Sequence, residues 1–546
     1  MSAADDTHEV FNQSPPFAGI DLFHSDPGLG ALVEGVPRAV VERLAALGES
    51  VGSRESFELG RLANVSPPVL RTHDATGVRI DVVEFNPAYH ALMRRSVAAG
   101  LHASVWDATG PEASVRTVAR AAALYMTAQV ECGHICPMTM TSASVAALAH
   151  APDLASVWLP KIRSRHYDSS NRRFPEKKGV TIGMGMTEKQ GGSDVAAGTT
   201  RAEDARDGTF RLTGHKWFLS APMSDAFLML AQAPEGLTCF LVPRFLPDGK
   251  RNPVRYMRLK DKLGNRSNAT AEAELHGATG FLVGEIGRGV PAIIDMVTLT
   301  RLDCAIASAG LMRMALAEAV HHVRHRRAFG EVLIEQPLMT RVLADMALDA
   351  LAAAALTFRL AESYDRAADD PAEAAFARLM TPAVKYWVSK VAPALVAEAM
   401  ECLGGNGYVE ESRLPRIYRE VPVNAIWEGA GNVMALDVMR VLRRSSEPLE
   451  TVLAGIEDSL GSAAKSTLNI IRAAAAVALA DEGSARILTE QLALTVAASA
   501  LRRRFPAVIA DAFFETRMSK PWRSTYGMLD SRFDSRAFIN FIFPAA

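Results

Sequence analysis

The chain has 546 residues, of which 49% are hydrophobic and 22% charged, a composition typical of a soluble globular protein. Lys and Arg number 59 against 61 Asp and Glu. The molecule as a whole therefore has no electrostatic bias toward polyanions, and a nucleic-acid surface would have to be a local patch. The length exceeds what one ordinary core accommodates and predicts several packed units.

The five cysteines are odd in number and mostly far apart, which is a poor disulfide framework and favours a reducing compartment. Cys132 and Cys136 flank His134, but no second ligand pair follows at metal-site spacing, so we expect a buried helix segment there and no metal. The acidic start, MSAADDTHEV, lacks the basic and apolar regions of a signal peptide, and no apolar run approaches a membrane span. These features predict a cytoplasmic protein that does not enter a membrane.

The first region in chain order is predicted to be helical. From Pro37 to about Asp168 the sequence is rich in Ala and Leu and poor in Gly. Between Val180 and about Glu285, short runs such as FLMLAQA and LTCFLVP are separated by Gly, Pro and Asn, as strands are. The sequence therefore predicts an N-terminal helical domain over residues 1–179 and a small β domain over residues 180–287.

Two long amphipathic helices are predicted next. Their apolar residues recur at spacings of three, four or seven: Leu302, Ile306, Ala309, Leu316, Val320 and Val323 in the first, and Leu338, Val342, Met346, Ala353, Leu356 and Leu360 in the second. Pro337 stands at the start of the second helix, where a missing N–H is harmless. This pattern predicts a helical bundle over residues 288–444. The composition changes at RRSSEPLE, and the Ala-rich segment 445–546 is predicted to form an additional helical domain.

The segment MTEKQGGSDV, residues 186–195, combines paired glycines with hydroxyl, amide and charged side chains. Gly191 and Gly192 allow a sharp turn and a close approach to a ligand, while Thr187 and Ser193 can exchange hydrogen bonds with it. Such a loop suits a polar, planar or phosphorylated ligand. Taken alone, it is more typical of a solvated turn.

Four further motifs follow this segment: GHKWFLS, HRRAFG, LGGNGY and IWEGAGN. In order and spacing, the five resemble motifs of the acyl-CoA dehydrogenase family, and RLKDKLGNRSNA, LGRLANV and PVNAIWEG resemble its AidB branch. The resemblance extends over residues 10–443. It implies a mainly α fold with a central β-barrel or β-sandwich domain between two helical domains, followed here by the additional helical domain.

The resemblance also implies a bound FAD. The residues expected to contact it lie in the five motifs: Met186, Thr187, Gly192, Ser193, Phe218, Leu219, Ser220, Arg326, Phe329, Gly404, Gly405, Trp427, Gly429, Ala430, Gly431 and Asn432. Arg326 would reach the FAD pyrophosphate of a neighbouring subunit, which implies a homotetramer built as a dimer of dimers. Each residue taken alone has an ordinary alternative, such as a solvated helix end for Arg326 or a core position for Phe218.

Glu428 in IWEGAGN is the expected catalytic base. Oxidation of an acyl-CoA requires a base to remove the α-proton while hydride leaves the β-carbon, and a carboxylate in apolar, desolvated surroundings becomes more basic. Some relatives carry the base on an earlier helix, just before an arginine, but that position here is Thr300. Four departures from the family pattern resemble its AidB branch and suggest a retained flavin with altered substrate chemistry: Lys189, Phe218, Glu401 and Ala430.

Two main functions remain open at this point. The AidB resemblance implies a flavoprotein that binds double-stranded DNA without sequence preference in the response to alkylating agents, with residual dehydrogenase activity. The alternative is a genuine acyl-CoA dehydrogenase that oxidises a branched or longer-chain acyl-CoA at its α,β bond. A third, blander interpretation is a helical assembly in which FAD is structural.

The DNA interpretation depends on basic residues near and beyond the end of the bundle. They are Arg440, Arg443, Arg444, Arg502, Arg503, Arg504, Arg517, Lys520 and Arg523. The triplet Arg502 to Arg504 ends a helix-like stretch, where the helix dipole favours positive charge even without a ligand. Contacts made by these residues would be to backbone phosphates and would weaken steeply with salt.

Overall fold

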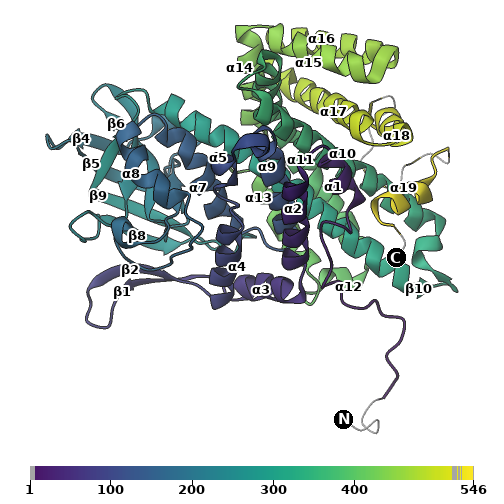
Figure 1. Ribbon diagram of the computed structural model, residues 1–546, viewed down its shortest axis with the longest axis horizontal. Coiled ribbons are helices and arrows are strands. Elements are labelled where there is room, and N and C mark those ends of the chain that lie inside the picture. The colour runs from purple at the N-terminus through teal and green to yellow at the C-terminus, as the bar shows by residue number, and fades with distance from the viewer. Residues whose placement is uncertain (1–6, 519–524, 527–528, 530–531, 545–546) are drawn as a thin grey trace.

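The computed structural model describes residues 7–518, 525–526, 529 and 532–544. Helices make up most of the molecule, and one β domain lies beside the helical body (Figure 1). The order along the chain is helical, then β, then helical. The predicted mainly α fold with a central β domain is therefore confirmed.

The N-terminal region consists of short and medium helices. They are α1 (Pro27–Leu32), α2 (Arg38–Val51), α3 (Arg54–Val65), α4 (Pro87–Ala98), α5 (Ser104–Asp107), α6 (Arg116–Ala128), α7 (Ile135–Leu148) and α8 (Pro152–Ile162). A hairpin of β1 (Val69–His73) and β2 (Arg79–Glu84) interrupts the stretch expected to be helical. It forms because apolar and polar residues alternate around a tight turn, in which the Asp74 carboxylate accepts hydrogen bonds from the Thr76 and Val78 N–H groups at 2.8 and 3.0 Å.

The turn before α7 also differs from the sequence expectation. Cys132 and His134 precede the helix rather than lying within it, because the buried Glu131 carboxylate accepts hydrogen bonds from the Gly133 and His134 N–H groups at 2.8 and 2.9 Å. The His134 ring, at 2.7 Å, and the Ser267 hydroxyl, also at 2.7 Å, bind the same carboxylate. Side-chain bonding to the backbone thus replaces a helical turn.

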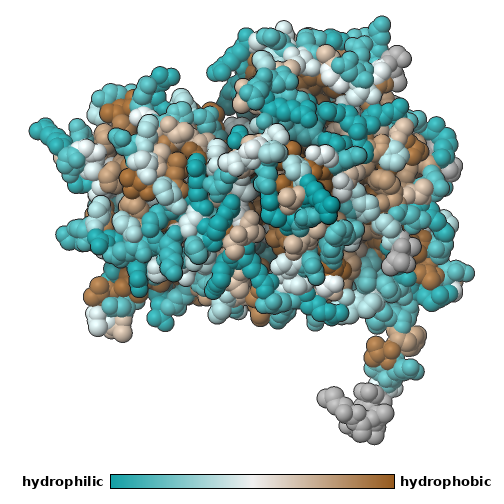
Figure 2. All heavy atoms as spheres, in the orientation of Figure 1, coloured by the Kyte–Doolittle hydropathy of each residue, from teal (hydrophilic) through white to brown (hydrophobic). Residues whose placement is uncertain are grey.

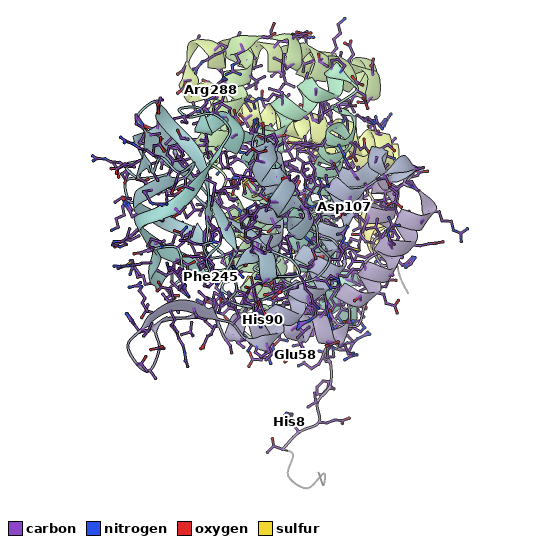
Figure 3. The ribbon with its side chains drawn as sticks, turned by 60° about the vertical axis from the view of Figure 1, so that its left-hand side comes forward. His8, Glu58, His90, Asp107, Phe245 and Arg288 are labelled. Carbon is purple, nitrogen blue, oxygen red and sulfur yellow. The ribbon has the colours of Figure 1, made fainter. Side chains whose placement is uncertain are left out.

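The β domain contains one seven-stranded sheet in the order β3-β5-β4-β6-β7-β9-β8. The strands are β3 (Ile182–Gly185), β4 (Arg201–Asp204), β5 (Phe210–Ser220), β6 (Ala226–Ala233), β7 (Gly236–Pro243), β8 (Val254–Leu259) and β9 (Thr270–Val283). Additional pairing of β3 with β6 and of β5 with β9 curls the sheet. Met184 pairs with Ser220, so the strands that lead to the two predicted flavin motifs are neighbours. In Figure 3, Phe245 and Arg288 mark opposite ends of the domain, and α9 begins beside Arg288.

Long helices form the bundle that follows. They are α9 (Gly289–His325), α10 (Pro337–Arg366) and α11 (Pro371–Cys402), with the shorter α12 (Gly405–Tyr408), α13 (Leu414–Asn424) and α14 (Gly431–Arg444). A two-residue hairpin, β10 (Arg327–Ala328) and β11 (Glu331–Val332), separates α9 from α10. The predicted apolar face of α9 is buried. On α10 the prediction is wrong for Leu338, which is 79% exposed because the first turn extends beyond the packed part of the bundle.

The C-terminal segment packs directly on the bundle. Its helices are α15 (Glu447–Leu460), α16 (Lys465–Ala480), α17 (Ala485–Arg504), α18 (Ala507–Met518) and α19 (Ser535–Ile542). Leu453, Leu488 and Phe513 belong to the same buried cluster as residues of α10 and α11. Figure 1 shows these yellow-green helices lying against the bundle. Among the described residues, no helix is long and apolar enough to cross a membrane.

Candidate active site

Glu428 lies in the loop between α13 and α14, at a strained backbone position. Its φ is 57°, in the left-handed region that costs a residue with a side chain on the order of 1 kcal/mol or more, and Gly429 follows at 108°. Cations bind three consecutive carbonyls of this loop. Lys385 Nζ donates to the Trp427 and Gly429 carbonyls at 2.7 and 2.5 Å, and Arg301 Nε donates to the Glu428 carbonyl at 2.9 Å. We call these three bonds the carbonyl clamp.

The two cations of the carbonyl clamp are themselves fixed. Lys385 is 1% exposed on α11, and burial lowers its pKa to about 8. Arg301 on α9 donates from Nη1 to the Asp437 carboxylate at 2.7 Å, and Arg378 binds the other oxygen of Asp437 at 2.9 Å. Three helices, α9, α11 and α14, thus determine the position of one loop.

The Glu428 side chain is half-buried, and burial raises the pKa of its carboxyl group. Thr300 lies beside it and lowers that pKa through its hydroxyl, as do the charges of Lys385 and Arg301. Burial raises the pKa of the nearby Cys136 and Cys304 thiols to about 12, so both stay neutral at physiological pH. Glu428 is therefore a carboxylate of increased basicity. The two neighbouring thiols stay protonated and do not act as bases in its place.

The loop MTEKQGGSDV is held by a buried ion pair. Glu188 is 2% exposed, and its carboxylate lies 2.8 Å from Lys216 Nζ, which is 1% exposed on β5. The same carboxylate accepts hydrogen bonds from the Thr199 and Thr200 N–H groups at 2.6 and 3.1 Å. Lys216 holds the pKa of Glu188 well below its usual range despite burial. The bonds to Glu188 therefore hold the loop closed, and the other side chains of the loop face outward.

The outward side chains suit a flavin. Thr187 and Ser193 are partly exposed or exposed, and a Cβ on Gly192 would lie 2.3 Å from the Thr187 hydroxyl, so only glycine allows the loop to close there. Phe218 on β5 is 47% exposed, an unusual exposure for an aromatic ring on a packed sheet. The Leu219 side chain is fully buried, so only its backbone can reach a ligand.

The structure brings the loop of Glu188 and the loop of Glu428 to one place. Met186 and Val195 from the first loop and Trp427 from the second pack against the same buried cluster, although more than 200 residues separate the two loops in the chain. The Trp427 ring is oriented by its Nε1–H, which donates to Asn424 at 3.0 Å. A planar ligand lying on Phe218 would therefore have the Glu428 loop nearby.

A second group of predicted cofactor residues lies elsewhere. Arg326 follows the last turn of α9, and the helical rise puts it about 38 Å from Arg301. Its guanidinium donates to the Asn12 carbonyl at 2.7 Å, and Phe329 beside it is 99% exposed. Gly404, with φ of 58°, and Gly405 are exposed at the end of α11. Within one chain, these residues therefore lie far from Glu428.

The predicted DNA-contacting residues fall into several classes. The prediction is wrong for Arg517, whose side chain is 4% exposed and paired with Asp345 and Asp349 at 2.7 and 3.0 Å. Arg517 therefore stabilises the packing of α10 and is unavailable to a ligand. Lys520 and Arg523 lie outside the described residues. The other predicted residues are exposed or partly exposed.

Carboxylates neutralise several of the remaining arginines. Arg443 binds Glu482 at 2.6 Å, and Arg502 binds Asp511 at 3.1 Å. Arg503 and Arg504 share Glu362 at 4.0 and 2.5 Å. Arg440 lies 3.9 Å from Asp437, which already binds two other arginines. Arg444 has no ion pair within the described part of the chain.

Several important side chains were not identified from the sequence. Lys385 and Arg301 make the carbonyl clamp, and Lys216 holds Glu188. The signal that could have found Lys385 is a lone charge in the apolar stretch TPAVKYWVS of a buried helix. Such a charge remains buried only if it is fully hydrogen-bonded.

Comparison with known proteins agrees with this geometry. Residues 12–169 match the family described as Adaptive response protein AidB N-terminal domain, and residues 183–278 and 287–443 match the middle and C-terminal domains of acyl-CoA dehydrogenases. The chain is 50% identical to AidB of Escherichia coli (strain K12) over 462 residues, 84% of this chain and 83% of that protein. The chain belongs to the acyl-CoA dehydrogenase family. It is an AidB homologue and a flavin-dependent oxidoreductase.

Two findings on a nematode relative extend the comparison. Acyl-CoA dehydrogenase family member 11 of Caenorhabditis elegans is 34% identical over 444 residues, 78% of this chain and 71% of that protein. The crystal structure of Caenorhabditis elegans ACDH-11 in complex with C11-CoA superposes with a TM-score of 0.85 at 28% identity, covering 100% of this chain and 98% of that chain. The C-terminal segment of this AidB homologue therefore has a structural counterpart, although the matched domain families end at residue 443.

The Glu188–Lys216 pair gives the first prediction. Glu188→Gln leaves Lys216 as an unpaired buried cation, and the loop loses its acceptor for Thr199 and Thr200, so flavin affinity should fall by about tenfold or more. The ratio of flavin to protein absorbance after dialysis measures this. Glu203→Gln, at an exposed position of β4, is the matched control and should keep its flavin. Full flavin retention in Glu188→Gln would contradict the role of the pair.

Proposed function

We propose that this AidB homologue binds FAD and uses Glu428 to remove the α-proton of an acyl-CoA thioester, with weak turnover. The carbonyl clamp carries this proposal, because cations from two other helices hold the Glu428 backbone in a strained conformation, and such strain clusters at active sites, where it positions a functional side chain. FAD, when bound, would accept the hydride from the β-carbon. Thr187, Ser193, Ser220 and Phe218 are the side chains that would hold it.

Weak turnover is supported by the surroundings of the base. Ala430 offers no side-chain donor, and the lysine and arginine charges lower the pKa of Glu428 and so oppose the effect of burial. The alternative, vigorous oxidation of a branched or longer acyl-CoA, is favoured by the C11-CoA complex of the nematode protein. Anaerobic reduction of bound flavin by acyl-CoAs of graded length and branching distinguishes the two.

A cytoplasmic location is part of the proposal, and the five free cysteines support it.

The second prediction concerns the base itself. Glu428→Gln keeps the shape of the side chain and removes its basicity, so the rate of flavin reduction by the best acyl-CoA should fall by on the order of 10² or more, with flavin still bound. Stopped-flow absorbance measures the rate. Glu49→Gln, at an exposed position of α2, is the matched control. An unchanged rate in Glu428→Gln would exclude Glu428, and a colourless protein that FAD cannot reconstitute would exclude the flavin.

We also propose a homotetramer built as a dimer of dimers. Phe329 and Tyr408 are 99% and 79% exposed beside the two motifs whose family counterparts contact a neighbouring subunit's cofactor, and Leu338 is 79% exposed at the start of α10. Phe11 is 79% exposed on the N-terminal segment, which projects from the body with hydrophobic atoms uncovered (Figure 2). Exposed apolar side chains gathered at the ends of the bundle are typical of a subunit interface.

The third prediction tests this assembly. Phe329→Asp and Leu338→Asp together should release dimers or monomers and lower flavin content, because they put charge into an apolar contact and separate Arg326 from the shared cofactor. Sedimentation velocity gives the mass, and absorbance gives the flavin. Val157→Asp, which is 51% exposed on α8, controls for the added charge. A wild-type monomer that retains FAD would contradict the proposal.

DNA binding in the response to alkylation is the further part of the proposed function. Its support is the AidB relationship together with two exposed arginines on α14, Arg440 and Arg444, spaced four residues apart on one helix face. A tetramer would present four copies of this modest patch and gain by multivalency. Arg443 lies on the same helix, with its charge reduced by Glu482. The triplet Arg502 to Arg504 forms a separate basic group, because it ends α17, about 30 Å along that helix from Glu482, and its charge is reduced by Asp511 and Glu362.

The fourth prediction separates these arginines. Duplex DNA should be retarded at low salt, and Arg440→Gln with Arg444→Gln should weaken retention more than the triple Gln variant at Arg502, Arg503 and Arg504, because the triplet is already paired with carboxylates. Electrophoretic mobility at two salt concentrations measures this, with flavin content as the folding control. No retention by the wild type at low ionic strength would remove the DNA role and favour the acyl-CoA enzyme.

A further inference from the structure

The segment RLKDKLGNRSNA, residues 258–269, lies directly against the GHKWFLS motif of β5. Its last residue, Ala269, accepts a hydrogen bond from the Ala221 N–H at 2.9 Å. Ala221 follows Ser220, one of the residues expected to contact the flavin. The packing of the sheet therefore fixes Asn268, the residue before Ala269, beside the end of this motif.

Among the described residues, the Asn268 side chain has no strong hydrogen-bonding partner. Lys262 Nζ donates to the backbone carbonyl of Asn268 at 2.6 Å, and this bond holds the loop without using the side-chain amide. The side chain is 1% exposed, yet neither its oxygen nor its nitrogen makes a hydrogen bond with any described residue. The Cys136 thiol lies next to the amide, but a thiol is only a weak partner. A buried amide left unpaired destabilises a protein, which indicates a partner outside the chain.

A second buried polar group lies near the same thiol. Tyr89 on α4 is 1% exposed, and its hydroxyl makes no hydrogen bond within the described part of the chain. An ionised Cys136 raises the pKa of Tyr89, and the Asn268 amide lowers the pKa of Cys136, so the thiol has both groups as neighbours. Two unpaired polar groups thus lie around one buried position.

Cys136 also lies near Glu428. The Glu428 charge raises the pKa of the Cys136 thiol, and Cys136 belongs to the buried cluster against which Met186 and Trp427 pack. The two unpaired groups therefore lie where the loop expected to contact the flavin meets the Glu428 loop. An acyl chain whose α-carbon faces Glu428 and whose β-carbon faces the flavin would pass this position.

We propose that the Asn268 amide and the Tyr89 hydroxyl bind a hydroxyl group on the acyl chain of the substrate, beyond its β-carbon. This inference rests on the proposed function and names the substrate class as a chain-hydroxylated acyl-CoA. An alcohol donates to the Asn268 oxygen and accepts from the Tyr89 hydroxyl, so it pairs both groups. An unsubstituted alkyl chain would leave both unpaired, and a site of this kind discriminates strongly against such an analogue.

A carboxylate fits this position less well than an alcohol. It has no proton to donate to the Asn268 oxygen. The negative charge of Glu131 already acts on Tyr89, and that of Glu428 acts on Cys136, so a further negative charge would be repelled. The position therefore favours a neutral group that both donates and accepts a hydrogen bond.

The test is calorimetric titration of the anaerobic, flavin-loaded protein with hexanoyl-CoA and with its derivatives hydroxylated at the fourth, fifth or sixth carbon. One derivative should bind about tenfold more tightly than hexanoyl-CoA, because it pairs two groups that the alkyl chain leaves unpaired. Asn268→Leu should remove this preference, and Tyr89→Phe should reduce it by about threefold. Equal affinities in the wild type, or a preference kept in Asn268→Leu, overturn the proposal.

Matched controls and a stability measurement accompany this titration. Asn469→Leu on α16 and Tyr418→Phe on α13 change exposed side chains and should keep the wild-type affinities. Because the Tyr89 hydroxyl is unpaired, Tyr89→Phe should unfold at or above the wild-type temperature when no acyl-CoA is present. A lower unfolding temperature would show that the hydroxyl stabilises the fold and would overturn its assignment to a ligand.

Flavin reduction by the same acyl-CoAs separates the hydroxyl-binding position from the proposed function. A wild type that prefers a hydroxylated chain but shows no flavin reduction contradicts the proposed function and not the hydroxyl-binding position. Flavin reduction together with equal affinities for all the acyl-CoAs contradicts only the hydroxyl-binding position. If no acyl-CoA binds, both are overturned.

Discussion

The candidate active site depends on cations bound to backbone carbonyls. Lys385 and Arg301 hold the carbonyls of Trp427, Glu428 and Gly429, and without these bonds the left-handed conformation at Glu428 would relax. The bonds require a buried lysine and an arginine oriented by Asp437, so α9, α11 and α14 must pack in one arrangement. The packing of the bundle therefore holds the Glu428 loop in its conformation.

A second buried lysine has the equivalent function in the β domain. Lys216 binds the Glu188 carboxylate and closes the loop expected to contact the flavin. The two lysines differ in their partners: Lys216 faces a full negative charge, whereas Lys385 faces carbonyl dipoles and has its pKa lowered to about 8 by burial. The Lys385 charge therefore remains available to act on Glu428.

Much of the fold could be predicted from the sequence because its elements are long and regular. The apolar spacing on α9 and the short apolar runs of β6 and β7 each identify one element, and the five motifs fix their order. The β1–β2 hairpin was not predicted, because its strands are half exposed and carry a weak apolar alternation. Leu338 was assigned to a buried face on spacing alone, and spacing does not show where a helix extends beyond its neighbours.

The candidate site could be predicted only in part. Motifs located Glu428 and the loop expected to contact the flavin, because the residues of each motif are contiguous in sequence. The carbonyl clamp could not be found that way, since Lys385 and Arg301 lie on other helices and their partners are backbone atoms without a sequence signature. Arg517 illustrates the opposite error: a basic residue in a basic segment was assigned to a surface, whereas two aspartates bury it.

The most direct test of the account is the pH dependence of flavin reduction by an acyl-CoA. A base must be deprotonated to act, so the rate should rise with pH, with a midpoint above the value of 4.5 for an ordinary glutamate, because burial raises the pKa of Glu428. In Lys385→Met the midpoint should move to higher pH, because a charge that lowers this pKa is removed. A rate that does not change with pH, or the same midpoint in both proteins, would contradict the account.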